Sequence, residues 1–396
     1  MSGVILTLNA GSSSLKFAVF DASVTAPKTA TIGGKITDIG RDPAFAARDA
    51  EGRALDKGLL ITLDPSLDHE QLMALLLPWL SEHLGTQPLL AVGHRVVHGG
   101  QKFQKPTPIT DEVLAALEVL APLAPLHQPH NLAAIHAVSN WQPGLQQIAC
   151  FDTSFHSGRE RLAELFALPR VLSDEGIIRY GFHGLSYQYI AGVLPDHLGP
   201  LANGRVIVAH LGNGSSMCAM KDSKSAATSM GFTALDGLMM GRRCGTLDPG
   251  VVLYLMQAKG MNAAEVEDLL YRQSGLLGVS GISNNMQVLL QSDDPHAQEA
   301  VDLYCYRAAS VLAGLVPAVG GLDVLVFTAG IGENAPDVRK KICDRLTWLG
   351  VTLNPDANAE NAVEISAQHS SVRVLTLPTN EEAVVASACR SFLALP

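Results

Sequence analysis

The sequence predicts an α/β fold built from a duplicated domain. The segment VILTLNAGSSSLKFAVF (4–20) is typical of an apolar strand, a turn of small residues and a returning apolar strand. The segment RVIVAHLGNGSSMCAM (205–220) repeats this plan in the other half of the chain. A third segment, DVLVFTAGIGEN (323–334), keeps the strand and a glycine loop and then enters a stretch of helical period. Two hairpins of the same unusual type indicate a duplication.

The elements between these segments alternate between strand and helix. Residues 89–100 are expected to form a strand that enters a glycine loop, and residues 145–156 a buried strand that ends in polar residues. Helical spacing of apolar residues is found in three segments: 109–124, 263–275 and 302–321. Clusters of Pro and Gly predict surface turns at 195–204 and 354–360. No long linker interrupts the pattern, so we expect two domains packed around a cleft.

Composition is typical of a large globular enzyme. The chain has 396 residues, of which 47% are hydrophobic and 17% charged, enough for two domains with sizeable cores. A net charge of −10 argues against nucleic acid as a partner, although a local group of arginines can still bind a small anion. The six cysteines show no CxxC spacing, which indicates reduced thiols and a cytoplasmic protein. We expect neither a signal peptide nor a membrane span.

The two turns rich in glycine and serine are suited to phosphate. Such turns expose backbone N–H groups and hydroxyls, although the spacing of a Walker loop is absent. One turn of this kind would more often be a plain connection. Two related turns, together with the TAGIGEN segment (328–334), favour a nucleotide site, because three glycine-bearing strand ends can converge on one ligand.

Charged residues stand in apolar or glycine-flanked segments. Arg95 lies in GHRVVHGG, where a buried guanidinium needs an anionic partner, and no acidic residue stands in that motif. Asp152 follows an apolar strand, where a carboxylate can hold a metal or cap a turn. The other candidates are His98, His183, Arg242, Arg243, Asn380, Glu381 and Glu382. With no catalytic cysteine signature, these residue types fit phosphoryl transfer assisted by Mg²⁺, while a purely structural role stays open for each.

An ordered series of blocks resembles the acetate kinase family, which has propionate and butyrate kinases as relatives. The blocks are NAGSSSLK, GHRVVHGG, APLH, FDTSFH, RYGFHG, HLGNGSS, SMGFTALDGLMMG, SGLLGVSG, TAGIGEN and PTNEE. The resemblance covers essentially the whole chain. It implies duplicated ribonuclease-H-like domains of the actin-like ATPase type, with a nucleotide cleft between them. The first domain would be 1–153 with 383–396, and the second 154–382.

The resemblance also implies an activity and its partners. The enzyme would move a phosphoryl group reversibly between ATP and a short carboxylate such as acetate, giving acetyl phosphate and ADP. It would use Mg²⁺, with Mn²⁺ as a substitute, and would act as a cytoplasmic homodimer. No general base is needed, because a carboxylate acceptor is already ionised at pH 7.

Individual residues receive roles from the same resemblance. The catalytic residues would be Asn9, Arg95, Asp152, His183 and Arg243, with His127 close by. The metal would be held by Asn9, Asp152 and Glu381, and we expect a shared ion to need the cleft between the domains. The acceptor would lie against Arg95, Val97, Leu126, Phe182 and Ala234. The nucleotide would lie against Ser12, Ser13, Ser14, Lys16, His210, Asn213, Gly214, Asn285, Gly330, Ile331 and Asn334.

Several positions depart from the family pattern. They are Ala234 for Pro, Thr246 for an acidic residue, Leu185 for Thr, Tyr187 for His, and Asn285 and Gln287 for Asp and Arg. The first leaves the choice between acetate and propionate open, and the last leaves the strictness for ATP over GTP open. A nucleotide-switched binding protein is the alternative from another class, although such proteins lack the paired arginines.

Overall fold

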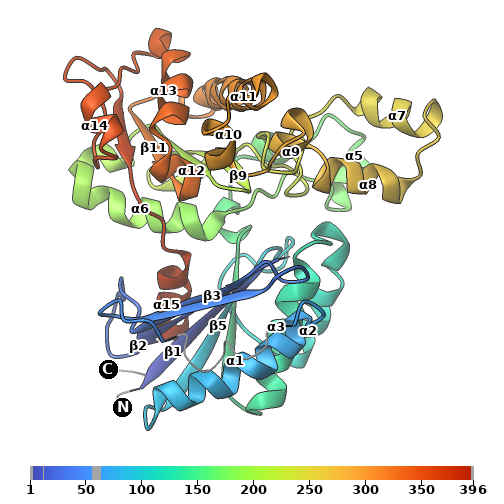
Figure 1. Ribbon diagram of the computed structural model, residues 1–396, viewed down its shortest axis with the longest axis vertical. Coiled ribbons are helices and arrows are strands. Elements are labelled where there is room, and N and C mark those ends of the chain that lie inside the picture. Colours follow the sequence, from blue (N-terminus) through green and yellow to red (C-terminus); the bar gives the residue numbers. More distant parts are fainter. Residues whose placement is uncertain (1–2, 12, 56–63, 394–396) are drawn as a thin grey trace. The chain divides into compact units, whose positions relative to one another are not determined.

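The computed structural model describes residues 3–11, 13–55 and 64–393 (Figure 1). The chain forms two compact units, one of residues 1–155 with 380–396 and the other of residues 156–379. Among the described residues, no helix is both long enough and apolar enough to cross a membrane.

The first unit is built on a seven-stranded sheet in the order β4-β3-β2-β1-β5-β7-β6. Its strands are β1 (Val4–Ala10), β2 (Leu15–Asp21), β3 (Ile32–Thr37), β4 (Ala44–Asp49), β5 (Leu89–Val96), β6 (Thr107–Pro108) and β7 (Gln146–Phe151). Strand β1 pairs antiparallel with β2 and parallel with β5, and β5 pairs parallel with β7. The carboxyl ends of β1, β5 and β7 therefore share one edge, where α/β sheets commonly bind ligands.

Helices cover both faces of this sheet. They are α1 (His69–Leu84), α2 (Asp111–Glu118), η1 (Ala121–Leu123), α3 (Gln128–Trp141), η2 (Ser154–His156) and α15 (Glu381–Phe392). Side chains of α1 and α3 share a buried cluster with Val92 of β5. The next residue, Gly93, faces α15, where an added Cβ would lie 2.4 Å from Val385 Cγ1 and 2.5 Å from Cys389 Sγ. The missing side chain therefore lets α15 pack closely against β5.

The second unit repeats the strand pattern of the first. Its sheet has the order β10-β9-β8-β11-β12, with β8 (Val206–Leu211), β9 (Ser215–Lys221), β10 (Lys224–Thr228), β11 (Val324–Thr328) and β12 (Arg373–Thr376). Strand β8 pairs antiparallel with β9 and parallel with β11, and β11 pairs parallel with β12. This matches β3-β2-β1-β5-β7 in order and direction, so the predicted duplication of ribonuclease-H-like units is confirmed.

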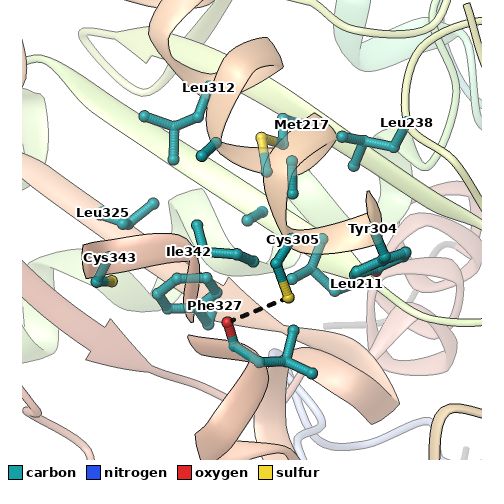
Figure 2. Close-up of a cluster of buried hydrophobic side chains, with 14 of the residues drawn as sticks. Leu211, Met217, Leu238, Tyr304, Cys305, Leu312, Leu325, Phe327, Ile342 and Cys343 are labelled. Atoms are coloured by element: carbon teal, nitrogen blue, oxygen red, sulfur yellow. Dashed lines mark hydrogen bonds between the residues drawn. The ribbon is translucent and has the colours of Figure 1, made fainter. Parts of the chain in front are cut away.

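Long and short helices complete the second unit. They are α4 (Arg161–Glu164), α5 (Arg170–Asp174), α6 (Gly184–Leu198), η3 (Gly199–Asn203), α7 (Pro249–Gln257), α8 (Ala263–Arg272), α9 (Gly275–Ser280), α10 (Met286–Leu290), α11 (Pro295–Val319), α12 (Ala329–Asn334), α13 (Pro336–Asp344), η4 (Thr347–Leu349) and α14 (Pro355–Ala359). The apolar side of α11 enters the core against β8 and β9, and Figure 2 shows Cys305 and Leu312 in one cluster with Leu325 and Phe327.

Two local expectations from the sequence are wrong. The TAGIGEN segment is not an open loop, because residues 329–334 form the short helix α12 directly after β11. The segments 195–204 and 354–360 are not simple turns: they hold the end of α6 with η3, and α14. Both helical segments contain a proline at a position that a helix tolerates, in the first turn of η3 and of α14.

Candidate active site

Four of the predicted residues come together at the carboxyl edge of the first sheet. Asn9 lies near the end of β1, Arg95 near the end of β5, and Asp152 directly after β7. Arg95 donates from Nε and Nη2 to the two carboxylate oxygens of Asp152, at 2.9 and 2.6 Å. Its Nη1 donates to Asn9 Oδ1 at 3.1 Å. Glu381, the first residue of α15, holds its Oε2 at 3.5 Å from Arg95 Nε.

The charges of this cluster are crowded and poorly hydrated. The side chain of Asp152 is 1% exposed, and those of Glu381 and Arg95 are 13% and 18% exposed. Burial raises the pKa of Glu381; Arg95 opposes this rise, whereas Asp152 and Glu382 add to it. Burial also disfavours the charged guanidinium, but Asp152 and Glu381 outweigh that effect and raise the pKa of Arg95. Several carboxylates thus compete for one guanidinium, and a further cation would stabilise them.

The oxygen atoms of this cluster fit Mg²⁺. The carboxylates of Asp152 and Glu381 and the amide oxygen of Asn9 are the ligand types that this ion prefers. Across the described residues, no group of three or more His, Cys, Asp and Glu side chains is placed to hold a metal ion. Mg²⁺ needs fewer protein ligands, because it commonly binds one or two carboxylates together with water and substrate phosphates. Asp152 and Glu381 both flank Arg95 within the first unit, so, contrary to our expectation, sharing an ion does not require the two units to meet.

The first glycine loop joins β1 to β2. The backbone N–H of Gly11 donates to Ser14 O at 2.8 Å and closes the turn. Ser14 is partly exposed and Lys16, on β2, is exposed. Ser12, which was also predicted to contact phosphate, lies outside the described residues.

Two side chains that the sequence did not single out hold the base of this loop. His69 Nε2 lies 2.7 Å from the carbonyl oxygen of Gly11. Asn131 Nδ2 donates to Ala10 O at 2.7 Å, and Asn131 Oδ1 accepts from the backbone N–H of Val97 at 3.0 Å. Asn131 thus ties the end of β1 to the end of β5. Neither residue belongs to the loop motif, so their role in holding the loop becomes visible only from the positions of α1 and α3 in the fold.

The residues predicted to line the acceptor lie on both units. Val97 is buried just beyond β5, and Leu126 and His127 precede α3 in the first unit. In the second unit Phe182 is buried and precedes α6, while Ala234 lies in the segment that follows β10. Their joint use as an apolar wall stays a prediction.

A second group gathers at the glycine loop between β8 and β9. His183 precedes α6 in the left-handed conformation, with φ 58°. Its ring stacks on that of His210 with 4.2 Å between centroids. A Cβ at Gly214 would lie 2.8 Å from Arg243 Nη2 and 3.4 Å from His183 Nε2, so the glycine allows both groups to approach the loop. Arg243 is anchored from its other side, where Nη1 donates to Ala234 O at 2.6 Å.

Buried hydroxyls hold the two histidines in place. His210 Nδ1 lies 2.8 Å from Ser186 Oγ, and His183 Nδ1 lies 2.8 Å from Ser216 Oγ. Ser216 Oγ also lies 2.5 Å from the phenolic oxygen of Tyr187. No sequence pattern predicted a role for these three hydroxyls. The signal was present in part, because Ser216 belongs to the Gly-Ser-Ser motif, but its partners are revealed only by the packing of α6 on the sheet.

The remaining nucleotide residues occupy two segments of the second unit. Asn213 Oδ1 accepts from Asn284 Nδ2 at 3.2 Å, which brings the SNN segment to the second loop. The next residue, Asn285, is exposed and caps α10, because its Oδ1 accepts from the backbone N–H of Gln287 at 2.9 Å. The side-chain oxygen of Asn285 is therefore already engaged, and its amide nitrogen is the end turned to other partners.

Helix α12 carries the last of the predicted nucleotide residues, which are Gly330, Ile331 and Asn334. It begins beside the second loop, since a Cβ at Gly212 would lie 3.8 Å from the Cβ of Ala329. Ala329 has a φ of 65° and its N–H donates to Glu333 Oε1 at 2.8 Å. Glu333, which the sequence analysis did not name, therefore stabilises this sharp turn from strand to helix.

Known proteins match this chain over nearly its whole length. Residues 4–387 match the Acetokinase family. An acetate kinase of Rhodopseudomonas palustris (strain TIE-1) is 54% identical over 391 residues, which cover 98% of this chain and 97% of that protein. An acetate kinase of Methylocella silvestris is 46% identical, with coverage of 98% and 97%.

Solved structures agree with these sequence relatives. A propionate kinase from Francisella tularensis superimposes with a TM-score of 0.88 at 34% identity, covering 98% of each chain. An acetate kinase from Porphyromonas gingivalis gives a TM-score of 0.84 at 34% identity, covering 97% of this chain and 98% of the other. With the motif residues gathered at the sheet edges, these matches establish that the chain belongs to the acetokinase family and is a phosphotransferase with a carboxyl group as acceptor.

Proposed function

We propose that the two groups of side chains described above form the catalytic apparatus of an acetate kinase. The reaction is the reversible transfer of the γ-phosphoryl group of ATP to acetate, which gives acetyl phosphate and ADP. The observation that carries the residue assignment is the cluster of Arg95, Asp152, Asn9 and Glu381, because these motif residues are distant in the sequence and meet at a ligand-binding edge.

The two arginines would reduce the electrostatic repulsion between the acceptor carboxylate and the phosphate. A carboxylate must approach a polyanionic phosphate, and like charges repel. Arg95 offers its guanidinium at the edge of the first sheet, and Arg243 offers its own at the glycine loop of the second. Both would stabilise the negative charge that spreads over the phosphoryl oxygens in the transition state. Because the acceptor is ionised at pH 7, no residue has to remove a proton from it.

The two glycine loops and the histidines would bind the phosphates. Ser14 lies in the first loop and Lys16 lies in β2 just beyond it, while Asn213 and Gly214 lie in the second loop. His183, at the second loop, would donate a hydrogen bond to an equatorial phosphoryl oxygen, with His210 stacked behind it. Asn285 and the α12 residues Gly330, Ile331 and Asn334 would lie against the nucleoside.

Asp152, Glu381 and Asn9 would hold Mg²⁺, with Mn²⁺ as a substitute. When bound, this ion would neutralise phosphate charge, which is its usual contribution to phosphoryl transfer. Further parts of the proposal are the homodimer, a cytoplasmic location and two functional domains, predicted as 1–153 with 383–396 and 154–382, although the compact unit that contains Glu381 already includes residues 380–396. These parts rest on the family resemblance.

Propionate is the second candidate acceptor. Ala234 is smaller than the proline usual in the family, and a propionate kinase from Francisella tularensis is among the similar structures. One extra methylene changes discrimination by only about 1–3 kcal/mol in an apolar pocket. We therefore expect acetate and propionate to be used with kcat/KM values within roughly one to two powers of ten, and butyrate to be poorer.

The test is to trap the acyl phosphate as a hydroxamate and to measure kcat/KM for formate, acetate, propionate and butyrate. The matched variant Ala234→Pro should lower the propionate-to-acetate ratio without abolishing acetate use. Failure to form any acyl phosphate would overturn the activity itself. An enzyme that uses acetate and leaves propionate untouched would refute only the role given to Ala234.

A further inference from the structure

We propose that Tyr187 is a positioning residue that, in the neutral form of His183, keeps the ring proton on Nε2, acting through the hydroxyl of Ser216. This inference rests on the role proposed above for His183 at the transferred phosphoryl group. It concerns a position where this chain has tyrosine in place of the histidine usual in the family, and it assigns that tyrosine a part in the reaction.

The three side chains form a continuous chain of short contacts. Tyr187 lies in the first turn of α6, four residues after His183. Ser216 lies in β9, just beyond the second glycine loop. The phenolic oxygen of Tyr187 is 2.5 Å from Ser216 Oγ, and Ser216 Oγ is 2.8 Å from His183 Nδ1. Tyr187 and Ser216 are fully buried, so bulk water does not compete for these hydrogen bonds.

The number of protons on these atoms determines the direction of each bond. A serine hydroxyl has one proton to donate, and neutral histidine carries a proton on only one ring nitrogen. If Tyr187 donates to Ser216, the Ser216 proton is directed to His183 Nδ1, which must then be the acceptor. The ring proton consequently resides on Nε2. If Tyr187 did not donate, Ser216 could accept from a protonated Nδ1, and Nε2 would present a lone pair instead.

The position of Nε2 makes this choice matter for the reaction. A Cβ at Gly214 would lie 3.4 Å from His183 Nε2 and 2.8 Å from Arg243 Nη2, so Nε2 faces the second loop beside a guanidinium. An anionic phosphoryl oxygen bound there needs a donor, and a lone pair on Nε2 would repel it. A half-turn of the His183 ring would replace Nε2 by a carbon at this position, and the stacked ring of His210 opposes that rotation.

The decisive variant is Tyr187→Phe, which removes only the hydroxyl. We expect kcat to fall about ten- to hundredfold, as for other residues that orient a catalytic group, with KM for acetate and ATP changed less than about twofold. In ¹⁵N-labelled protein, the shifts of His183 should move from the Nε2–H form toward a mixture of both forms. Ser216→Ala should give the same changes, and combining the two substitutions should add little more.

The matched control is Tyr180→Phe. Tyr180 is also buried, lies in the same segment, and donates its hydroxyl to Gly176 O at 2.9 Å. The Tyr180→Phe variant should lose some thermal stability, while its kcat and the ¹⁵N shifts of His183 stay unchanged. His183→Ala tests the role of His183 itself: full activity in that variant would overturn it. If His183→Ala is inactive while Tyr187→Phe keeps both wild-type kcat and wild-type shifts, the inference about Tyr187 alone is refuted.

Discussion

At the scale of single residues, the two motif arginines are held in different ways. Arg95 is paired with Asp152 and lies near Glu381, although its own motif contains no acidic residue. Arg243 instead donates to the backbone carbonyl of Ala234. Removing Arg95 would therefore also leave two buried carboxylates without their cation, which destabilises the fold. Arg243 is the cleaner probe of catalysis.

We predict that Arg243→Ala lowers kcat by roughly 10²–10³, since one well-placed donor is worth about 3–4 kcal/mol of transition-state stabilisation. Steady-state kinetics on the folded variant, checked by circular dichroism, give the measurement. Arg242→Ala is the neighbouring control and should change kcat much less. A folded Arg243→Ala enzyme with nearly normal kcat would exclude the proposed role of this arginine.

The hydrogen bonding of the Asn285 side chain leads to a second prediction, about the choice of nucleotide. The side-chain oxygen caps α10, so the amide cannot turn over without losing that hydrogen bond, and the other end of the amide is a donor. A donor can pair with acceptors of either adenine or guanine. We therefore expect GTP to work within about tenfold of ATP, a difference near 1.4 kcal/mol.

The substitution Asn285→Asp keeps the cap and replaces the outward donor by an acceptor. It should increase the preference for ATP, because the adenine amino group donates where guanine has a carbonyl. Donor kcat/KM values for ATP and GTP in both proteins provide the comparison. A strong preference for ATP that the substitution leaves unchanged would mean that Asn285 serves only as a helix cap.

At the scale of the elements, the start of α15 brings a carboxylate to the edge of the first sheet. Asn380 caps the helix by accepting from Ala383 N at 3.0 Å, and this fixes Glu381 and Glu382 in the first turn. Carboxylates are favoured at a helix N-terminus, yet Glu381 is largely buried near Asp152, so its pKa is raised. Helix α15 thus places a carboxylate whose ionised form is disfavoured at a position where a bound cation would stabilise it.

We predict that Glu381→Gln and Asp152→Asn raise the Mg²⁺ concentration needed for half-maximal rate or abolish turnover. Titration of Mg²⁺ at pH 7 tests this, and Glu382→Gln is the adjacent control, expected to have a smaller effect. If either of the first two variants keeps the wild-type rate and Mg²⁺ dependence, that residue is structural.

The raised pKa of Glu381 also sets the sign of a pH effect. As pH falls through that pKa, Glu381 is protonated earlier than an exposed glutamate and ceases to be a metal ligand. The Mg²⁺ requirement should therefore rise more steeply toward acidic pH in the parent than in Glu381→Gln. Because the ionised form is disfavoured in the folded state, the same variant should not lose thermal stability near pH 7.

At the scale of the whole molecule, helix α7 bears on the proposed homodimer. None of its residues is buried, yet it carries Val251, Leu253, Tyr254 and Met256, with Leu253 and Tyr254 more than half exposed. Exposed apolar side chains gathered on one helix mark an association surface in soluble proteins. The second copy required by the family resemblance would cover them.

We predict that Leu253→Asp converts a dimer to a monomer in sedimentation or light-scattering measurements. Val119→Asp is the matched control, because Val119 is an exposed valine of the first unit at 77% exposure and should leave the dimer intact. A wild-type protein that is monomeric at micromolar concentration would exclude the homodimer. A Leu253→Asp protein that stays dimeric would show that the dimer interface does not depend on α7.

Much of the fold follows from the sequence alone. The two hairpins at 4–20 and 205–220 have apolar alternation and small-residue turns, which are local signals, and β1–β2 and β8–β9 form there. The helical period of 302–321 is likewise local, and α11 covers residues 302–319 of it. The TAGIGEN segment was misjudged because glycine favours loops, whereas the bond from Ala329 to Glu333 closes a helical turn that composition does not reveal.

The chemistry that this chain offers can be read from its sequence: the duplicated domain, the glycine loops and the identities of Asn9, Arg95, Asp152, His183 and Arg243. Which of these side chains meet depends on the three-dimensional fold. Parallel pairing of β1, β5 and β7 places Asn9, Arg95 and Asp152 at one edge, and α15 returns Glu381 to it from the end of the chain. The chain of contacts from Tyr187 through Ser216 to His183 also depends on packing between α6 and β9. Such contacts depend on long-range packing, which brings together residues that no local sequence pattern relates.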